Sequence, residues 1–421
     1  MARIVMTCLA GMGGSAIVAG DTARGLAERG HEVHMVSDRV PFAAGRDLVK
    51  LQTHSDRETH VDTTGVLWHT ASVSTESAVL GGNELTYARF AAVLSSVVLS
   101  VDPEIINVHY AVPAAFAAAG VRNLVAPNAR LVVSFHGTDA SNPPPELVSL
   151  TSIGLTAADA VTACSPWLAD LVRRQFNVLD VQVTPNWVRP GAGKLARTER
   201  LALRREMGMC RGEKLLIHAS NFRPVKQAVH TLDALVGALQ GGHDARLVLV
   251  GDGEELPAVL AEAERVGLAD RVVAMGPRSD APQLIAAADA LILPSASESF
   301  SLVTLEAAVA GVPTVGYNVA GMPYAVRDGL TGLLAQPEYR SELGLMTRAV
   351  LDPAMRRVIA VEGPRHARRF SRDAMLDRLE MVLDPRMRLG RSVPELPGPD
   401  SLGLLPQLPN EHSGPGEPIG I

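Results

Sequence analysis

Residues 290–313 read "ALILPSASESFSLVTLEAAVAGVP". The apolar run "ALILP" indicates a buried strand, "SASESF" a loop, and "SLVTLEAAVA" a helix that ends at Gly311, with Pro313 just beyond it. A strand followed by a loop and a helix is the repeating unit of α/β proteins with parallel sheets. The stretch therefore predicts an α/β fold with polar side chains where a strand ends.

The same unit recurs along most of the chain. In the first half, strand-like runs such as "ARIVMTCLA" (2–10), "HEVHMVSD" (31–38) and "ARLVVSFHG" (129–137) alternate with helical stretches. The polar segment "RPGAGKLARTERLALRREMG" (189–208) contains no such run, and the alternation restarts at "KLLIHAS" (214–220). The expected fold is α/β, with two doubly wound, Rossmann-like domains facing a cleft.

The expected domain boundaries follow from this alternation. The first domain covers residues 1–190, the second covers residues 191–370, and a last helix covers residues 371–384. Residues 385–421 are rich in proline and glycine and lack hydrophobic periodicity, so we predict a disordered tail.

Composition excludes several classes of protein. The net charge of −6 argues against a nucleic-acid partner. The three cysteines are odd in number and far apart, which favours a reducing cytoplasm over a disulfide framework. The most apolar stretch, residues 105–121, is interrupted by His109 and Pro113, so no integral membrane segment is expected. Nothing in the sequence decides whether the chain forms a homo-oligomer.

The quoted stretch also contains the first candidate binding residues. The helix that begins at Leu302 offers free N–H groups and partial positive charge to a pyrophosphate. Glu306 could accept hydrogen bonds from a ribose diol, and Glu298 could hold sugar hydroxyls. The alternative is that both glutamates are solvated surface charges. Their position at the carboxyl end of a strand favours the binding role.

Other loops after strands carry further candidates. "LLIHASNFRPVKQ" (215–227) places Arg223 and Lys226 on one loop, where two cations suit a diphosphate leaving group. The sequence has no Asp-x-Asp pair, so no metal ion or other cofactor is expected. His136, in "VVSFHGTD" (132–139), could hydrogen-bond a reacting sugar, although a lone histidine is more often structural. "VGDGEE" (250–255) is a tight turn that would line the same cleft or be a plain turn.

Two rival interpretations remain open. "GMGGSA" (11–16) matches G-x-G-x-x-A between a strand and a helix, and Asp38 ends the next strand, as in NAD-dependent oxidoreductases. A non-catalytic nucleotide-sugar binder is the other alternative. A metal site at His31 and His34 is disfavoured, because the spacing does not fit the zinc-binding helix motif.

With these residues in place, the sequence resembles the family 4 retaining glycosyltransferases, which have the GT-B fold. The resemblance runs through "GGSAIVA", "VHYAVP", "HGTD", "HASNFRPVK", "LVGDGEE" and "ESFSLVTLEAAVAGVP" to "GLTGLLA". Within that family it is most similar to the N-acetylglucosaminyl malate synthases of bacillithiol biosynthesis and, more distantly, to the mycothiol glycosyltransferases. It implies a small-molecule donor, such as UDP-N-acetylglucosamine, and a small acceptor, such as L-malate.

The resemblance also implies roles for particular residues. Catalytic positions are His136, Arg223, Lys226 and Glu298. Donor-binding positions are Gly14, Asn221, Gly251, Asp252, Gly253, Arg278, Ser299, Phe300, Ser301, Leu302 and Glu306. Acceptor-binding positions are Ser15, Tyr110 and Ser134. The final helix would cross back onto the first domain.

Three positions depart from the family pattern. Ser301 stands where the family usually has glycine, and Ala320 and Tyr324 interrupt what is commonly Gly-Gly-x-Pro-Glu. A side chain at position 301 would lie where backbone approaches the donor. These departures leave a second substrate pair open, a GDP-activated octose and ergothioneine, as in the thioglycosyltransferase of lincosamide antibiotic biosynthesis.

Overall fold

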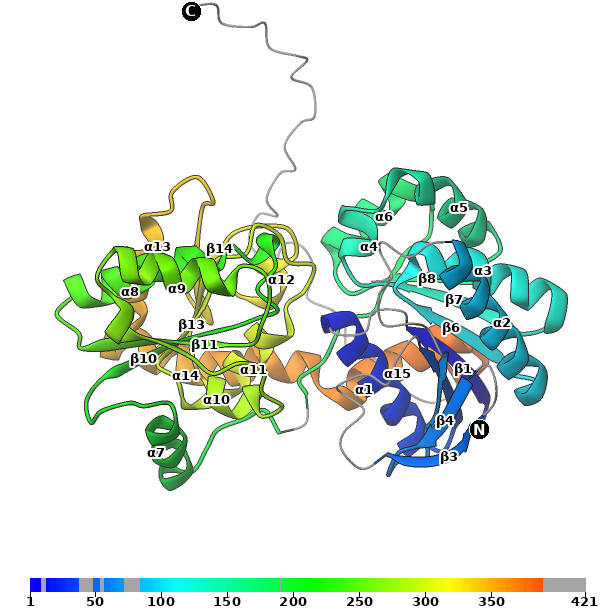
Figure 1. The fold of residues 1–421 in the computed structure, drawn as a ribbon, viewed down its shortest axis with the longest axis horizontal. Coiled ribbons are helices and arrows are strands. Elements are labelled where there is room, and N and C mark those ends of the chain that lie inside the picture. Colours follow the sequence, from blue (N-terminus) through cyan, green and yellow to red (C-terminus); the bar gives the residue numbers. More distant parts are fainter. Residues whose placement is uncertain (9–12, 38–47, 54–56, 72–83, 190, 389–421) are drawn as a thin grey trace, which may run out of the picture.

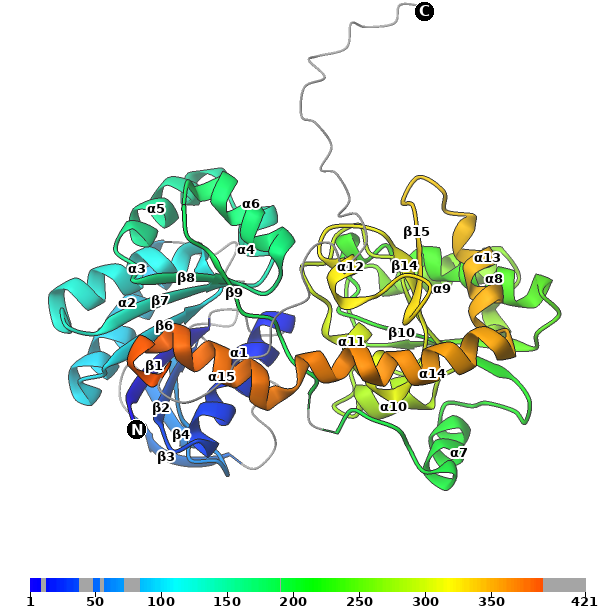
Figure 2. The ribbon, with the colours of Figure 1, turned by 180° about the vertical axis from the view of Figure 1, so that it is seen from behind.

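The computed structural model describes residues 1–8, 13–37, 48–53, 57–71, 84–189 and 191–388. Within these residues the chain forms two α/β lobes that lie side by side, joined by the segment before α7 (Arg197–Glu206) and by the long helical stretch at the end of the chain (Figures 1 and 2). The predicted α/β class, with two Rossmann-like lobes built on largely parallel sheets, is confirmed.

The N-terminal lobe is built on a sheet with the strand order β3-β4-β5-β2-β1-β6-β7-β8-β9 within the described residues. Its strands are β1 (Arg3–Cys8), β2 (Glu32–Ser37), β3 (Val49–Thr53), β4 (Arg57–Val61), β5 (Leu67–Ala71), β6 (Ile105–His109), β7 (Arg130–Phe135), β8 (Ala160–Ala163) and β9 (Gln182–Val183). Its helices are α1 (Gly14–Glu28), α2 (Glu84–Val101), α3 (Ala111–Val125), α4 (Thr138–Ser141), α5 (Pro145–Thr156) and α6 (Pro166–Phe176). The central strands are parallel and almost fully buried, so their sequences are continuous apolar runs.

One edge of this sheet corrects the expectation of purely parallel pairing. Strand β4 pairs antiparallel with both β3 and β5, and β5 then joins the parallel sheet beside β2. The sequences of these three strands mix polar and apolar residues because an edge needs only one buried face. No apolar run marks them, and the sequence analysis missed them.

The C-terminal lobe has a smaller parallel sheet in the order β12-β11-β10-β13-β14-β15. Its strands are β10 (Lys214–Ala219), β11 (Ala245–Val250), β12 (Val272–Ala274), β13 (Ala290–Leu293), β14 (Thr314–Tyr317) and β15 (Gly332–Ala335). Its helices are α8 (Thr231–Gln240), α9 (Leu256–Arg265), α10 (Ala281–Ala287), α11 (Leu302–Ala310), α12 (Met322–Ala325), α13 (Glu342–Val350) and α14 (Pro353–Ala367). The loops after β10, β11 and β13 therefore emerge at one edge of the sheet.

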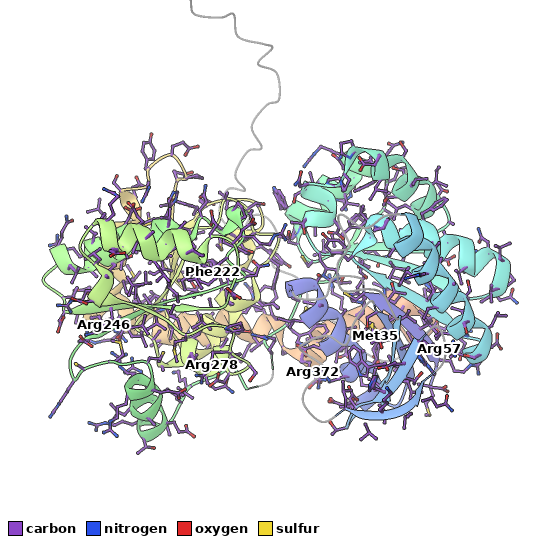
Figure 3. The ribbon with its side chains drawn as sticks, in the orientation of Figure 1. Met35, Arg57, Phe222, Arg246, Arg278 and Arg372 are labelled. Atoms are coloured by element: carbon purple, nitrogen blue, oxygen red, sulfur yellow. The ribbon has the colours of Figure 1, made fainter. Side chains whose placement is uncertain are left out.

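The last helix, α15 (Arg372–Leu383), packs on the N-terminal lobe, although α14 before it belongs to the C-terminal lobe (Figure 2). Gly25 of α1 permits this approach, because a Cβ there would lie 2.7 Å from Leu376 Cδ1. Figure 3 shows Arg372, the first residue of α15, beside α1. Arg29, which follows the last residue of α1, bonds Asp377 at 2.6 Å and Glu380 at 2.8 Å, and these ion pairs hold α15 against the N-terminal lobe. Residues 389–421, predicted to form most of a disordered tail, lie outside the described residues.

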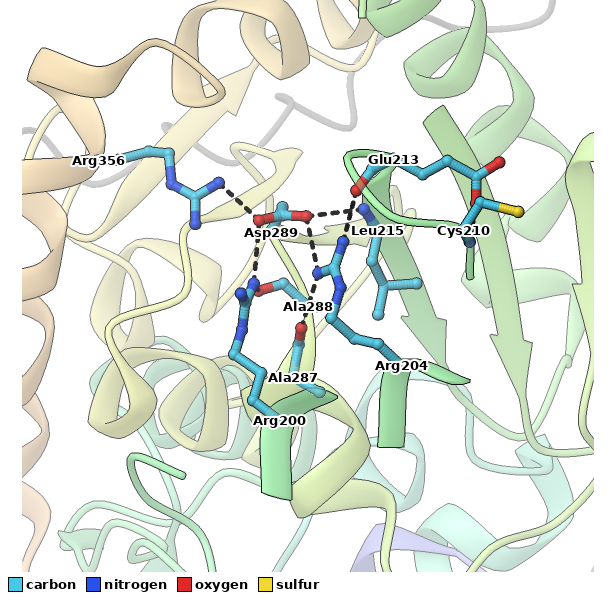
Figure 4. Close-up of polar contacts among 9 residues, drawn as sticks. All are labelled: Arg200, Arg204, Cys210, Glu213, Leu215, Ala287, Ala288, Asp289 and Arg356. Carbon is cyan, nitrogen blue, oxygen red and sulfur yellow. Dashed lines mark hydrogen bonds and ion pairs between the residues drawn. The ribbon is translucent and has the colours of Figure 1, made fainter. Parts of the chain in front are cut away.

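A buried carboxylate ties the linker helix to the C-terminal lobe (Figure 4). Asp289, just before β13, bonds Arg200 at 3.0 Å, Arg204 at 2.9 Å and Arg356 of α14 at 2.7 Å. It also accepts a hydrogen bond from the backbone N–H of Leu215 at 2.8 Å. Burial by itself would raise the pKa of Asp289, but the surrounding arginines and the Leu215 N–H hold that pKa well below its usual range.

In the part of the chain that the structure describes, we find no helix with both the length and the apolar character needed to cross a bilayer.

Candidate functional site

The loops that follow β10 and β11 pack backbone against backbone. A Cβ at Gly251 would overlap the carbonyl oxygen of Ser220, and one at Gly253 would overlap that of Asn221. Both glycines have positive φ angles, 121° and 154°, so two independent reasons require glycine here. Asp252 between them is exposed and accepts a hydrogen bond from Gly253 N–H at 2.8 Å. These contacts fix the position of the loop that carries Arg223 and Lys226.

Lys226 and Glu298, predicted separately from two loops, form an ion pair. Lys226 Nζ lies 2.7 Å from Glu298 Oε1, and Ser295 Oγ donates to the same oxygen at 2.8 Å. Lys226 ends a short 3₁₀ helix, Pro224–Lys226, and Arg223 immediately before it is exposed. Glu298 is buried, whereas Lys226 is only partly buried. The pair therefore joins the β10 loop, which also carries Arg223, to the β13 loop.

Helix α11 begins at Leu302, as predicted, and Ser301 is its N-cap. Ser301 has φ 67° and ψ 100°, a backbone conformation that favours glycine. Its Oγ is buried and has no hydrogen-bond partner among the described residues. This conformation would suit glycine, the residue that the family resemblance implies at this position, and Ala320, with φ 51°, occupies a second such position.

Ser301→Gly is expected to raise the free energy of unfolding by about 1 kcal/mol, because glycine adopts a positive φ without the steric cost of a Cβ. Chemical denaturation of the two proteins measures the difference. Ser341→Gly is the matched control, because Ser341 has φ −62° and is exposed, so glycine there brings no relief. A variant at position 301 that is no more stable than wild type would show that this backbone is unstrained.

Glu306 has a different environment from the one predicted. It is 1% exposed, and one of its oxygens, Oε1, is bonded to Arg189 of the interlobe segment. Its other oxygen, Oε2, is buried without a hydrogen-bond partner among the described residues. Burial raises the pKa of Glu306, although the charge of Arg189 opposes the shift. Glu306 can thus offer one oxygen to a ribose, and Arg189 holds the other.

The N-terminal lobe presents the His136 loop to this site. Asp139 accepts hydrogen bonds from the backbone N–H groups of His136, Gly137 and Ala111, at 3.1, 2.7 and 3.0 Å. Burial raises the pKa of Asp139 to about 6, against the effect of these donors. Gly137 has φ 144°, and a Cβ there would overlap Ser299 Oγ of the opposite lobe. The two lobes therefore touch where the predicted catalytic loops meet.

Gly137→Ala is expected to lower the free energy of unfolding by about 1–3 kcal/mol, because alanine is strained at this φ and its methyl group meets Ser299. Thermal and urea denaturation measure the loss. Gly120→Ala serves as the control, because Gly120 is exposed within α3 and a Cβ there has open space, so alanine should stabilise the helix slightly. Equal stability of Gly137→Ala and wild type would argue against the close approach of the two lobes.

Of the predicted acceptor residues, Tyr110 and Ser134 are buried in the N-terminal lobe. Tyr110 has φ 69° and its hydroxyl lies 3.1 Å from that of Thr138. Burial raises the pKa of Tyr110 to about 12, and the positive charge of Arg223, from the other lobe, partly opposes this. Ser134 Oγ is enclosed by Asn107 and Thr162, at 3.2 and 3.0 Å. Ser15 lies in the first turn of α1, whose first residue, Gly14, is exposed.

Arg278, predicted to contact the nucleotide base, is engaged elsewhere. Its guanidinium bonds both oxygens of Asp280 at 2.7 Å and Glu206 of α7 at 2.6 Å. It lies in the C-terminal lobe, below Phe222 in the view of Figure 3. Hydrogen bonds to Asp280 and Glu206 raise its pKa further. Contact with a base would require Arg278 to exchange these partners. Two other residues were predicted to bind the sugar donor. Asn221 is partly buried, and Phe300 is buried.

Comparison with known proteins identifies the family. Residues 12–191 match the model described as Glycosyltransferase Family 4, and residues 213–351 match Glycosyl transferases group 1. The chain is 30% identical over 341 residues to N-acetyl-alpha-D-glucosaminyl L-malate synthase of Bacillus anthracis, covering 79% of this chain and 83% of that relative. The chain belongs to glycosyltransferase family 4. This family 4 glycosyltransferase is also 34% identical over 206 residues to D-inositol 3-phosphate glycosyltransferase of Actinosynnema mirum, an alignment that covers 46% of this chain and only 49% of that relative.

Solved structures of low sequence identity share the fold of this glycosyltransferase. HepE of Anabaena, solved with UDP and glucose, has a TM-score of 0.75 at 20% identity, over 91% of this chain and 100% of that one. Sucrose-phosphate synthase of Thermosynechococcus elongatus has a TM-score of 0.76 at 18% identity, over 93% and 100%. The family matches and the 30% identical relative confirm the predicted enzyme class, a glycosyltransferase, over the dehydrogenase alternative. Gly11 and Met12 of the glycine loop, and Asp38, on which that alternative partly depended, lie outside the described residues.

Three residues of the glycosyltransferase site were missed by the sequence analysis. Arg189 stood in a segment that resembled a plain linker, and its bond to Glu306 crosses 117 positions of sequence. Asn107 and His109 occupy β6, where polar residues in an apolar run, "IINVH", were the available signal. Residues that alternate along a strand share one face, so Asn107 and His109 could have been paired from spacing alone.

Proposed function

We propose that the chain moves a sugar, with retention of anomeric configuration, from a nucleoside-diphosphate sugar to a small acceptor. The Lys226–Glu298 ion pair carries this proposal, because it joins a cation and the proposed sugar-binding carboxylate at 2.7 Å, on the loop that also carries exposed Arg223. UDP-N-acetylglucosamine is the proposed donor and L-malate the proposed acceptor. The 30% identical relative is named for a product of that kind.

The proposed chemistry needs charge stabilisation more than a nucleophile. Negative charge grows on the diphosphate as the bond between sugar and oxygen breaks. Arg223, Lys226 and the N-terminus of α11 would stabilise that charge. The departing diphosphate itself would take the proton from the acceptor, on the face of the sugar that it leaves. These groups supply the charge that a divalent ion would otherwise provide, so the proposal includes no metal ion or other cofactor.

The arrangement of the two lobes would protect the donor from water. Gly137 of one lobe touches Ser299 of the other, and Arg189 bridges to Glu306. Closure of such an interface around a nucleotide sugar excludes water that would otherwise hydrolyse it. We place this reaction in the cytoplasm, with small molecules as its only required partners.

The departures at Ser301 and Tyr324 favour a second candidate. Ser301 puts a side chain at the start of α11, and Tyr324 is buried with its hydroxyl unpaired among the described residues. A side chain at position 301 would lie where backbone approaches the donor, so a donor sugar other than N-acetylglucosamine would suit this site. The second candidate is transfer of a GDP-activated octose to the sulfur of ergothioneine.

A release assay separates these possibilities. Purified protein is mixed with UDP- or GDP-sugars and with malate, inositol phosphate or a low-molecular-weight thiol, and free nucleoside diphosphate is measured. The proposal predicts release only when a donor and an acceptor are both present. A protein that is stabilised thermally by a nucleotide sugar yet releases nothing with any acceptor would be a binder.

A further inference from the structure

A chain of hydrogen bonds leads from the backbone of β7 to His136. Asn107 Nδ2 lies 3.2 Å from the carbonyl oxygen of Val132, and Asn107 Oδ1 lies 2.8 Å from His109 Nε2. His109 Nδ1 lies 2.9 Å from His136 Nε2, and the two rings stack with centroids 5.0 Å apart. Asn107 and His109 are 0% and 3% exposed, so no bulk water competes for these bonds.

The donor and acceptor of each hydrogen bond in this series follow from the Val132 carbonyl group. The Val132 carbonyl oxygen can only accept, so the group facing it must be the Asn107 NH₂, and Asn107 Oδ1 must face His109. An amide oxygen also only accepts, so His109 carries its proton on Nε2. In a neutral imidazole the other nitrogen is then a lone pair, and His109 Nδ1 accepts from His136 Nε2–H.

The last atom in the chain is consequently an acceptor. With its proton on Nε2, His136 has a lone pair on Nδ1. That atom is buried and has no hydrogen-bond partner among the described residues. The neighbouring residue, Gly137, touches Ser299 of the opposite lobe. An unpaired buried acceptor costs stability unless something else satisfies it, and a bound sugar hydroxyl has the required donor.

Both rings are held neutral, as this argument requires. Burial lowers the pKa of His136 to about 4, and burial followed by the neighbouring His136 lowers that of His109 well below its usual value. At neutral pH neither ring would carry a second proton. The hydrogen-bond order therefore fixes one tautomer for each histidine.

We propose that Asn107 and His109 are positioning residues that fix the tautomer of His136, so that its Nδ1 accepts a hydrogen bond from a hydroxyl of the transferred sugar. This inference rests on the proposed function for the identity of the bound group, but the tautomer itself does not. Asn107, His109 and His136 together form a hydrogen-bond relay. The relay selects sugars that carry a hydroxyl at the contacted position, because a carbonyl, an ether oxygen or a hydrogen atom there would leave His136 Nδ1 unpaired.

Long-range ¹H–¹⁵N correlation spectra of protein labelled with ¹⁵N-histidine test the tautomer directly in the wild type. His136 and His109 are both expected as neutral Nε2–H forms at pH 7. Two other buried histidines calibrate the same spectrum. His218 Nδ1 faces the carbonyl of Ile292 at 2.8 Å and should be the Nδ1–H form, and His366 Nε2 faces that of Ala325 at 3.0 Å and should be Nε2–H. A His136 found as Nδ1–H or as imidazolium would overturn the proposal.

Asn107→Leu should release the relay. Leucine offers no acceptor to His109 Nε2–H, so nothing fixes the proton of His109 on Nε2, and His109 Nδ1 can then carry a proton and donate to His136 Nε2. His136 is in that case expected as a mixture of tautomers, while His218 and His366 stay unchanged. Should this variant fail to fold, His109→Phe keeps a stacked ring without a lone pair, and His136 is expected as a mixture of tautomers. An unaltered His136 signal in either folded variant would contradict the relay.

Kinetics connects the relay to the sugar. Each folded variant is expected to lose about 10-fold to 100-fold in kcat, because the hydroxyl is no longer held in place. Affinity for free UDP or GDP, which carry no sugar, should stay unchanged. Deoxy donors, each lacking one hydroxyl, should identify the contacted position. With the wild type, the donor that lacks the contacted hydroxyl should show the same loss of kcat that the variants show with the complete donor. With the variants, that deoxy donor should lower kcat little further. If no donor turns over in the wild type, the proposed function fails, but the tautomer assignment is still decided by the spectra.

Discussion

Lys226→Ala is expected to lower turnover of a productive donor and acceptor pair by about 10²–10³-fold, with the fold intact. Lys226 is one of the groups that would stabilise the charge developing on the departing diphosphate. Its removal takes away an interaction that strengthens as the sugar bond breaks, so kcat should fall more than the donor KM rises. Initial rates of nucleoside diphosphate release measure both parameters, and circular dichroism checks the fold.

Lys50→Ala is the matched control for this prediction. Lys50 is exposed on β3, at the outer edge of the N-terminal sheet, and pairs with Glu58 at 2.6 Å. A surface ion pair of this kind contributes little to stability, and the position lies on the strand farthest from the parallel core. The turnover of Lys50→Ala should match that of the wild type. If Lys226→Ala also turned over at the wild-type rate, Lys226 would have no role in the mechanism.

Asp289→Asn should lower the free energy of unfolding by about 3–5 kcal/mol, the cost typical of removing one partner from a buried ionic cluster. Asparagine keeps the shape of the side chain but leaves Arg200, Arg204 and Arg356 without their common counter-charge. Urea denaturation measures the loss. Asp270→Asn is the control, because Asp270 is exposed and the described residues form no ion pair with it.

The pH dependence of this cluster has a definite sign. The pKa of Asp289 is lower in the folded protein than in the unfolded chain, so its contribution is present above the unfolded value of about 3.9. The contribution declines as the pH falls from there through the folded pKa. Wild-type stability should therefore fall more steeply below about pH 4 than that of Asp289→Asn. Parallel curves for the two proteins would contradict the lowered pKa.

The sequence predicted the parts of the fold that depend on local pattern. Buried parallel strands appear as apolar runs, and Gly311 marks the end of α11, where it has φ 73°. The antiparallel strands β3 and β4 escaped notice because their pairing partners, and not their composition, define them. Register and pairing at a sheet edge depend on contacts between segments, which a single sequence does not display.

The candidate site, like the fold, has features that the sequence predicted and features that depend on contacts between distant segments. Residues at the carboxyl ends of strands could be gathered from topology, and Lys226 and Glu298 do come together. Their direct bond, the pairing of Glu306 with Arg189, and the engagement of Arg278 by Glu206 all join residues at least 72 positions apart. Such partners depend on how loops fold over one another. The relay behind His136 was hidden for another reason, since its direction comes from a backbone carbonyl that any residue could supply.

A crystal structure of the protein with UDP or GDP bound is the most direct test of the account. The diphosphate is predicted to lie at the N-terminus of α11, within hydrogen-bond distance of Arg223 and Lys226, with the ribose on Glu306 Oε2. A diphosphate held by the glycine loop before α1, with Arg223 and Lys226 pointing away from it, would contradict the assignment of the donor to the C-terminal lobe.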